Sequence, residues 1–373
     1  FDNYINLYVE NVAEAPKITL SSDSFNENIS PNTTISTLSN VNELASTSTS
    51  YSLVNGDGDS DNSSFIIDQT SLIIISSPDY ENKKIYNIRV KALDNNNLST
   101  ESKISLVVNN LNESPTEIKL TNSSIDENVF SNSLFSAILT TDPDLDDNHT
   151  YSLVSGLGDT DNNLFMISGK SLLINHSPDY EDKSIYSVRL RSEDIGFLST
   201  SKTFTLSVNN LNEAPTSIGL NTSSVNENVS VKTTVALLTT IDSDISDTHS
   251  YSLVTGAGSV DNGSFLVDGT NLKINVVPDY ETQTLYNIRL KTTDNSGESC
   301  EKALIISIVD LNETPTSIEL SSSNFNENLA ANSIVAILST IDQDASDSHV
   351  YTLVSGNGDN DNVFFTIDGS NLK

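Results

Sequence analysis

The sequence has 373 residues, of which 51 are acidic and 18 are basic, and its formal net charge at pH 7 is −33. Such a chain lacks the cationic surface that displaces counterions from phosphates, so nucleic acid is excluded as a partner and anionic membranes are disfavoured. The lone Cys300 excludes a disulfide framework, and no apolar run approaches the roughly 18 residues that a membrane-inserted span needs.

Similar segments recur along the chain with a period of 100 residues. The triplet NEN or DEN begins at residues 26, 126, 226 and 326, and PDYE begins at 78, 178 and 278. A fixed period of this length indicates a tandem array of small domains. We therefore predict the end of a preceding repeat in 1–15, whole repeats in 16–114, 115–214 and 215–314, and the N-terminal part of a further repeat in 315–373. The chain is expected to be a piece of a longer protein.

Each repeat is predicted to consist of short β-strands. The segment IYNIRVKA at 85–92 alternates apolar and polar side chains, and KTFTLSV at 202–208 does the same. Clusters of Gly, Asn, Asp and Ser interrupt the chain every 8 to 12 residues or so, and no helical pattern with caps is persuasive. About seven strands per hundred residues is typical of an all-β Greek-key sandwich of the immunoglobulin-like type.

A glycine-rich segment, GLGDTDN at 156–162, recurs at 56, 256 and 356. Its first copy carries Asp57, Asp59 and Asp61, which resembles a metal-binding loop, but the third copy has Ala257 and Ser259 at matching places. Glycine and Asx residues between two strands are ordinary turn chemistry. We interpret the segment as a turn, with a metal loop as the alternative.

Four acidic motifs recur per repeat. The segment TDPDLDDNHTYSLV at 141–154 pairs Asp142 with Asp144, and PDYE pairs Asp79 with Glu81. In an extended backbone residues i and i+2 point to the same side, so each pair could offer oxygens to one hard cation. The third motif, NNLNESP at 109–115, is predicted to be an interdomain linker, and the fourth is the Glu of NEN. The alternative is a merely solvated acidic surface.

The three histidines of this pattern, His149, His249 and His349, lie in the loop that precedes a predicted strand. As isolated imidazoles they are interpreted as polar loop residues and not as metal ligands.

In chain order the motifs E-N, D-x-D, Y-S-L, P-D-Y-E and V-x-D-x-N-E-x-P resemble cadherin repeats, in the form found in very long bacterial surface proteins, over essentially the whole chain. DLNETP is similar to the D-x-N-D-N-x-P linker of that family shortened by one residue, and PDYE is similar to its L-D-R-E. The resemblance implies Ca²⁺ bound between successive repeats, with ligands from the lower repeat, the linker and the upper repeat.

Carried over position by position, the resemblance implies one ligand set for each linker. At Pro115 the set is Glu27, Asp79, Glu81, Asn110, Asn112, Glu113, Asp142, Asp144 and Asp194. At Pro215 it is Glu127, Asp179, Glu181, Asn210, Asn212, Glu213, Asp242, Asp244 and Asp294. At Pro315 it is Glu227, Asp279, Glu281, Asp310, Asn312, Glu313, Asp342 and Asp344.

The chain departs from the family pattern in two ways. Asn110 and Asn210 replace the linker Asp, and a Glu such as Glu113 replaces an Asp-Asn pair, which leaves the number of ions per junction open. At the Pro16 junction Asn42 and Leu44 stand in place of the paired aspartates, so weak or no calcium binding and a bendable joint are expected there.

The expected function is therefore structural. The sequence carries no nucleophile elbow, zinc signature or phosphate loop, so no enzymatic activity is expected. We expect a calcium-rigidified extracellular or cell-surface stalk that acts in cell adhesion, projecting a binding region or contacting like repeats or other cell-surface proteins. The alternative is a non-catalytic spacer of a large extracellular enzyme or toxin. Any anchor or export signal would lie outside the sequence.

Overall fold

The computed structural model describes residues 7, 12, 14–41 and 48–373. The predictions for Asn42 and Leu44, and for most of residues 1–15, fall outside the described residues. The chain divides into two compact units, one up to Asn210 and one from Leu211 onward, and each is considered by itself.

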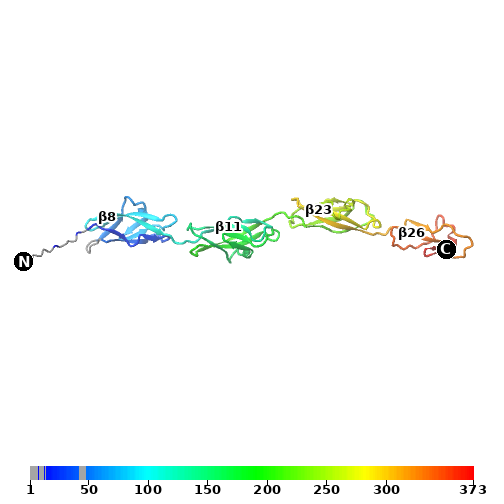
Figure 1. The fold of residues 1–373 in the computed structure, drawn as a ribbon, viewed down its shortest axis with the longest axis horizontal. Helices are drawn as coiled ribbons and strands as arrows, with labels where there is room; N and C mark the ends of the chain where they lie inside the picture. Colours follow the sequence, from blue (N-terminus) through cyan, green and yellow to red (C-terminus); the bar gives the residue numbers. More distant parts are fainter. Residues whose placement is uncertain (1–6, 8–11, 13, 42–47) are drawn as a thin grey trace, which may run out of the picture. The chain divides into compact units, whose positions relative to one another are not determined.

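The first unit contains two β-sandwiches, which we call repeat 1 and repeat 2 (Figure 1). Repeat 1 consists of β1 (Ile18–Leu20), β2 (Ser24–Asn26), β3 (Thr33–Asn40), β4 (Thr49–Leu53), β5 (Phe65–Asp68), β6 (Ser71–Ile74), β7 (Ile85–Asp94) and β8 (Ser99–Asn109). Repeat 2 consists of β9 (Glu117–Leu120), β10 (Ser124–Asp126), β11 (Ser133–Thr141), β12 (Thr150–Leu153), β13 (Phe165–Ser168), β14 (Ser171–Ile174), β15 (Ile185–Glu193) and β16 (Ser199–Asn209).

The second unit contains repeat 3 and the strands that follow it, which we call repeat 4. Repeat 3 consists of β17 (Ser217–Leu220), β18 (Ser224–Asn226), β19 (Thr234–Ile241), β20 (Ser250–Leu253), β21 (Phe265–Asp268), β22 (Asn271–Ile274), β23 (Leu285–Thr293) and β24 (Ser299–Val309). Repeat 4 has β25 (Ser317–Leu320), β26 (Ala336–Ile341), β27 (Ile367–Asp368) and β28 (Asn371–Leu372). The only helices among the described residues are one-turn 3₁₀ segments at Asn62–Ser64, Asn162–Leu164, Asn262–Ser264 and Asn362–Phe364.

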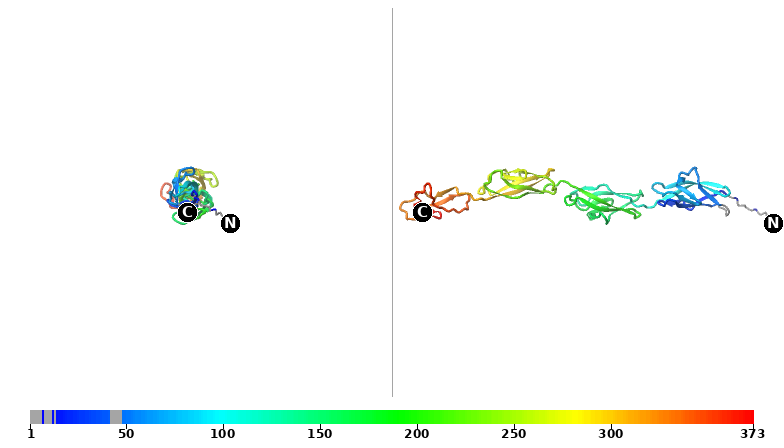
Figure 2. Two further views of the ribbon diagram at one scale, coloured as in Figure 1. Left: turned by 90° about the vertical axis from the view of Figure 1, so that its left-hand side faces the viewer. Right: turned by 180° about the vertical axis from the view of Figure 1, so that it is seen from behind.

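Two four-stranded sheets face each other in each of repeats 1, 2 and 3 (Figures 1 and 2). In repeat 1 their strand orders are β1-β3-β6-β5 and β2-β8-β7-β4, and repeats 2 and 3 follow the same scheme. The all-β sandwich prediction is confirmed, with eight strands per repeat where about seven were expected. The extra strand arises because the start of each repeat is split. β1 pairs antiparallel with β3 in one sheet, and β2 pairs parallel with β8 in the other.

The core lies between the two sheets and follows the predicted alternation of side chains. In β7 Tyr86, Ile88 and Val90 are buried, and the matching residues of β15 and β23 are buried as well. The Tyr86 ring meets the Phe65 ring edge to face with centroids 5.4 Å apart, and such aromatic pairs are favourable beyond the area that they bury. The packed core fixes the strand ends, and the acidic motifs sit at those ends.

The glycine-rich segment is a turn, as predicted. The buried carboxylate of Asp61 accepts the backbone N–H of Asn87 at 2.8 Å and pairs with Lys83. Asp57 pairs with Lys103. These acids are thus satisfied by donors from neighbouring strands, and the metal-loop alternative loses its support.

The turn between β15 and β16 contains a backbone outlier. Phe197 has φ +67°, in the left-handed region, while the matching residues in the other repeats are Asn97 at +65° and Gly297 at +100°. Asparagine and glycine tolerate this region, but a bulky residue there is strained. The Phe197 side chain is 80% exposed, so its ring gains little packing in compensation. At this turn repeat 2 therefore stores local strain that repeats 1 and 3 lack.

Replacing Phe197 by Asn should stabilise repeat 2 by about 1 kcal/mol, because asparagine adopts left-handed φ at lower cost. Urea unfolding followed by hydrogen exchange on β15 and β16 would measure the gain. Phe197→Ala is the matched control, since it removes the ring but keeps an unfavourable residue in this region. Equal stability of the Asn and Ala variants would contradict the explanation.

Candidate metal centre

The lower part of the Pro115 junction is built on Glu27, which follows β2 and is 1% exposed. Its carboxylate accepts the backbone N–H of Tyr80 at 2.7 Å and of Leu111 at 2.8 Å. One buried side chain thereby fastens the PDYE segment and the linker to the end of repeat 1. Carboxylate oxygens of Glu27, Asp79 and Glu81 lie within 4.8 Å of one another, and we call these residues the lower group.

The middle of the junction joins the linker to repeat 2. The backbone N–H of Glu113 donates to Oδ2 of Asp144 at 2.8 Å, and the side-chain amide of Asn110 donates to Oδ1 of Asp144 at 2.9 Å. Oxygens of Glu81, Glu113 and Asp144 lie within 4.8 Å of one another and form the middle group. Glu81 therefore belongs to two groups of acids, which places them side by side.

The upper group consists of Asp142, Asp147 and Asp194, whose oxygens again lie within 4.8 Å of one another. Asp194 accepts the side-chain amide of Asn112 at 3.1 Å and the backbone N–H of Leu198 at 2.9 Å. The linker thus contacts the end of β15 as well as the loop after β11. All nine residues predicted for this junction lie in the lower, middle or upper group or hydrogen-bond to one of them.

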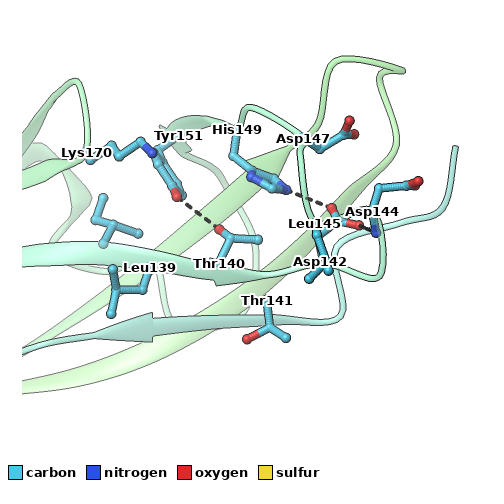
Figure 3. Close-up of a pocket in the computed structure, with 11 residues that line it drawn as sticks. Leu139, Thr140, Thr141, Asp142, Asp144, Leu145, Asp147, His149, Tyr151 and Lys170 are labelled. Atoms are coloured by element: carbon cyan, nitrogen blue, oxygen red, sulfur yellow. Dashed lines mark hydrogen bonds and ion pairs between the residues drawn. The ribbon is translucent and has the colours of Figure 1, made fainter. Parts of the chain in front are cut away.

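Figure 3 shows how the Asp142 carboxylate is held. The Nε2 of His149 lies 2.7 Å from its Oδ2, and the backbone N–H of Asp144 donates to its Oδ1 at 3.1 Å. The Asp142 side chain is only 3% exposed. Asp142 and Asp147 line a cavity of about 330 Å³ together with Tyr151 and Lys170.

The backbone between Asp142 and Asp144 is bent and not extended as predicted, and the binding of one ion by this pair stays a prediction. Asp142 lies in the upper group and Asp144 in the middle group. The physical reason is that Asp142 accepts the N–H of Asp144, so the backbone turns here instead of extending. Asp79 and Glu81 do share a group, although Tyr80 and Glu81 lie in a turn.

Two residues acquire roles that sequence reasoning did not give them. Asp147 was not predicted as a ligand, yet it lies in the upper group, and its Oδ2 is buried without a hydrogen-bond partner among the described residues. His149 is no isolated imidazole, because it binds the carboxylate of Asp142. The signal that could have found both is the spacing D-x-D-x-x-D-x-H, which recurs with Asp247 and Asp347.

The Pro315 junction, which lies within the second unit, repeats this arrangement. Glu227 is 1% exposed and accepts the N–H groups of Tyr280 at 2.9 Å and Leu311 at 2.7 Å. The N–H of Glu313 donates to Asp344 at 2.7 Å. Asp279 caps the turn that contains Glu281, Asn312 bonds the backbone oxygen of Glu313, and His349 binds Asp342. Oxygens of Glu227, Glu281 and Asp310 lie within 4.8 Å of one another.

The residues predicted at Pro215 are divided between the two units. On the first unit Glu127 accepts the N–H of Tyr180, and Asn210 donates to Glu181 at 3.0 Å, while Asp179 caps the same turn. On the second unit the N–H of Glu213 donates to Asp244 and Asn212 donates to Asp294. His249 binds Asp242 there. The half on the second unit has the contacts of the corresponding half at Pro115, while on the first unit Asn210 bonds Glu181 where Asn110 bonds Asp144.

The donor set suits a hard divalent cation. The groups described above consist of carboxylate oxygens and are flanked by amide side chains. Oε2 of Glu113 and of Glu313, like Oδ2 of Asp147, is buried without a hydrogen-bond partner among the described residues. A buried carboxylate oxygen without a donor is costly unless a cation meets it. The residues therefore fit Ca²⁺.

Electrostatics within the groups follow from crowding. Burial raises the pKa of Glu81, and the neighbouring charges of Glu27, Glu113 and Asp144 raise it further. Burial and like charges also raise the pKa of Asp147 and Asp310. For Asp294 burial acts upward, but hydrogen bonds from Asn212 and three backbone amides leave the pKa below its ordinary value. The pKa values of crowded acids are thus raised, and the pKa of Asp294, which hydrogen-bond donors hold, is lowered.

These shifts predict how the metal-free chain responds to pH. An acid whose folded pKa is raised binds protons more readily when folded, so its contribution to stability grows as the pH falls toward that pKa. The ordinary pKa values of Glu81 and Asp147 are 4.5 and 3.8. The stabilising effect of their protonation should therefore grow as the pH falls from neutral and should be complete at about pH 4. In chelator the thermal midpoint should rise on acidification from pH 7 to 5, and a steady fall would contradict this.

Comparison with known proteins adds the following findings. No protein-family model matches the chain. Human Protocadherin Fat 4 is 28% identical over 352 residues, which is 89% of this chain and 7% of that protein. The chain thus spans only a small part of the length of the curated relatives that it matches.

Solved structures share the fold. A structure titled Protocadherin gammaB7 EC3-6 cis-dimer matches with a TM-score of 0.65 and 20% identity over 96% of this chain and 91% of that one. The Protocadherin GammaB4 extracellular domain matches with a TM-score of 0.62 and 18% identity over 98% of this chain and 62% of that one. Among the described residues no helix has the length and apolar character needed to cross a membrane.

Proposed function

We propose that the chain is a tandem array of cadherin repeats and forms a calcium-stiffened, extracellular segment of a cell-surface or secreted protein that acts in adhesion. Likeness to Fat 4 and to protocadherin extracellular domains supports the adhesive role and the location outside the cell. We propose no catalytic role, because the convergent acids flank linkers and are not poised in a substrate cleft. A spacer role in an extracellular enzyme has no comparable support among the relatives.

The observation that carries the calcium proposal is the convergence at Pro115 of acids from repeat 1, the linker and repeat 2. Two like charges about 4 Å apart near a protein surface repel by about 4 kcal/mol, so the arrangement is costly without a cation. The proposed ligands here are the nine predicted residues together with Asp147. At Pro215 and Pro315 the proposed ligands are the residues predicted from the sequence, with Asp247 and Asp347 added.

Bound calcium would cancel this repulsion and link the two repeats through shared ligands. Glu81 and Asp144, which belong to different repeats, both contribute to the middle group, so an ion there would restrain bending of the linker. Extracellular modules typically bind calcium with dissociation constants of about 10⁻⁴ to 10⁻³ M, which suits calcium levels outside cells. Removal of calcium is expected to free the joint.

Small-angle scattering of the chain in millimolar calcium and in chelator tests the proposal. The scattering in calcium should correspond to a narrow distribution of interrepeat distances, and chelation should broaden it, because repulsion between the acids then opens the linkers. Far-ultraviolet circular dichroism is the control that the β-sandwiches stay folded. Identical scattering curves with and without calcium, together with no binding by calorimetry, would overturn the proposal.

The variant Asp147→Asn separates a ligand from a structural residue. In chelator it should raise the thermal midpoint, because it removes a charge from the crowded upper group. In calcium it should weaken binding about tenfold, because a charged ligand is lost. Asp146→Asn is the matched control, since Asp146 is an exposed neighbour in the same loop. A higher thermal midpoint in chelator without any loss of calcium affinity would count against a ligand role for Asp147.

A further inference from the structure

The Pro115 and Pro315 junctions differ at one acidic position of the linker. Asn110 in the first corresponds to Asp310 in the second. The candidate ligands Glu27, Asp79, Glu81, Asn112, Glu113 and Asp144 have identical counterparts 200 residues later. The two junctions therefore form an internal comparison in which an amide nitrogen is exchanged for a carboxylate oxygen.

At Pro115 the side-chain amide of Asn110 donates a hydrogen bond to a carboxylate oxygen that a cation could otherwise bind. The Asn110 side chain donates to Oδ1 of Asp144 at 2.9 Å, while the N–H of Glu113 satisfies Oδ2 at 2.8 Å. Both oxygens of this central carboxylate are thus paired within the protein. Asn210 acts similarly, since its amide donates to Oε1 of Glu181 at 3.0 Å within the first unit. An asparagine linker hence offsets part of the acidic charge without metal.

At Pro315 the corresponding side chain adds to the crowding. Asp310 lies within 4.8 Å of Glu227 and Glu281, and as a carboxylate it supplies no donor to Asp344. At this linker position the Pro315 junction carries one more negative charge than the Pro115 junction, whereas Asp194 of the upper group at Pro115 has no counterpart within the 373 residues. The acids around Asp344 are consequently more crowded without metal than the acids around Asp144, and this part of the junction attracts a divalent cation more strongly.

From this difference we propose that the chain has two classes of calcium junction, in which Asp310 makes the Pro315 junction bind calcium more tightly and depend on it more strongly than the asparagine junction at Pro115. The charge count of the ligands, together with the rigidity of the site, tunes calcium affinity in oxygen sites. As calcium rises, the aspartate junction fills and stiffens first, and the asparagine junction follows. This inference rests on the proposed calcium-dependent function.

Reciprocal substitutions in the whole chain, Asp310→Asn and Asn110→Asp, test the proposal by calorimetric titration with calcium. The wild-type titration should show a tight and a weaker phase. Asp310→Asn should weaken the tight phase about tenfold, and Asn110→Asp should move sites from the weaker phase to the tight one. Asn163→Asp, which adds the same charge at an exposed position of the 3₁₀ segment of repeat 2, should change neither phase.

Terbium luminescence assigns each phase to its junction. Tyr80 and Tyr280 lie in the turns that bind Glu27 and Glu227, and the chain has no tryptophan, so these tyrosines are the expected sensitisers. Tyr280→Phe should remove the emission that appears at low terbium, and Tyr80→Phe should remove part of the emission that appears later, the rest coming from Tyr180 in the matching turn. Scattering in chelator adds a metal-free readout, in which Asn110→Asp should broaden the distribution of interrepeat distances.

The outcomes separate the two proposals. Absence of calcium and terbium binding in the wild-type chain would overturn both. Binding that stiffens the chain but shows a single affinity, unchanged by either reciprocal substitution, would overturn only the two-class proposal. A loss of the tight phase in Asp310→Asn together with a gain in Asn110→Asp would support it, provided that circular dichroism shows both variants folded.

Discussion

Repulsion between carboxylates that the fold holds close together is the constraint on which the junctions depend. Glu27 illustrates it, because its burial and its two backbone hydrogen bonds leave it no freedom to move away from Asp79 and Glu81. The sandwich supplies the rigidity, since a packed core fixes the strand ends that bear the acids. The same restraint that makes the metal-free lower group unfavourable prepares it for a cation, because these side chains need little further ordering on binding.

Hydrogen-bond donors decide how far that repulsion is offset within the protein. Backbone amides satisfy Glu27 and Asp144, and the amide side chain of Asn112 satisfies Asp194. Other oxygens, such as Oδ2 of Asp147, are buried without such a donor among the described residues. A junction thus contains some carboxylates that hydrogen-bond donors satisfy and others that lack such donors. Exchanging a single amide for a carboxylate changes the proportion of the two.

The histidines fit into this division of labour. His149 bonds the carboxylate of Asp142 and thereby restrains one member of the upper group, and His249 and His349 do the same for Asp242 and Asp342. Orientation of a ligand by a neighbour outside the cation's own ligand set is a general feature of metal sites. The repetition of the contact in three repeats indicates that the loop folds in the same way each time.

The sequence alone determined the repeat period, the alternating strands such as β7, the turn at Asp61 and the acids that flank each linker, because period, alternation and spacing are local properties of a chain. Only the tertiary structure decided that Asp142 lies in the upper group and Asp144 in the middle group. It also decided that Asp147 lies in the upper group with Asp142 and that His149 binds Asp142. The reason is that a loop's direction depends on which backbone N–H each carboxylate accepts and on the neighbouring strands that bury it. Spacing along the sequence contains neither.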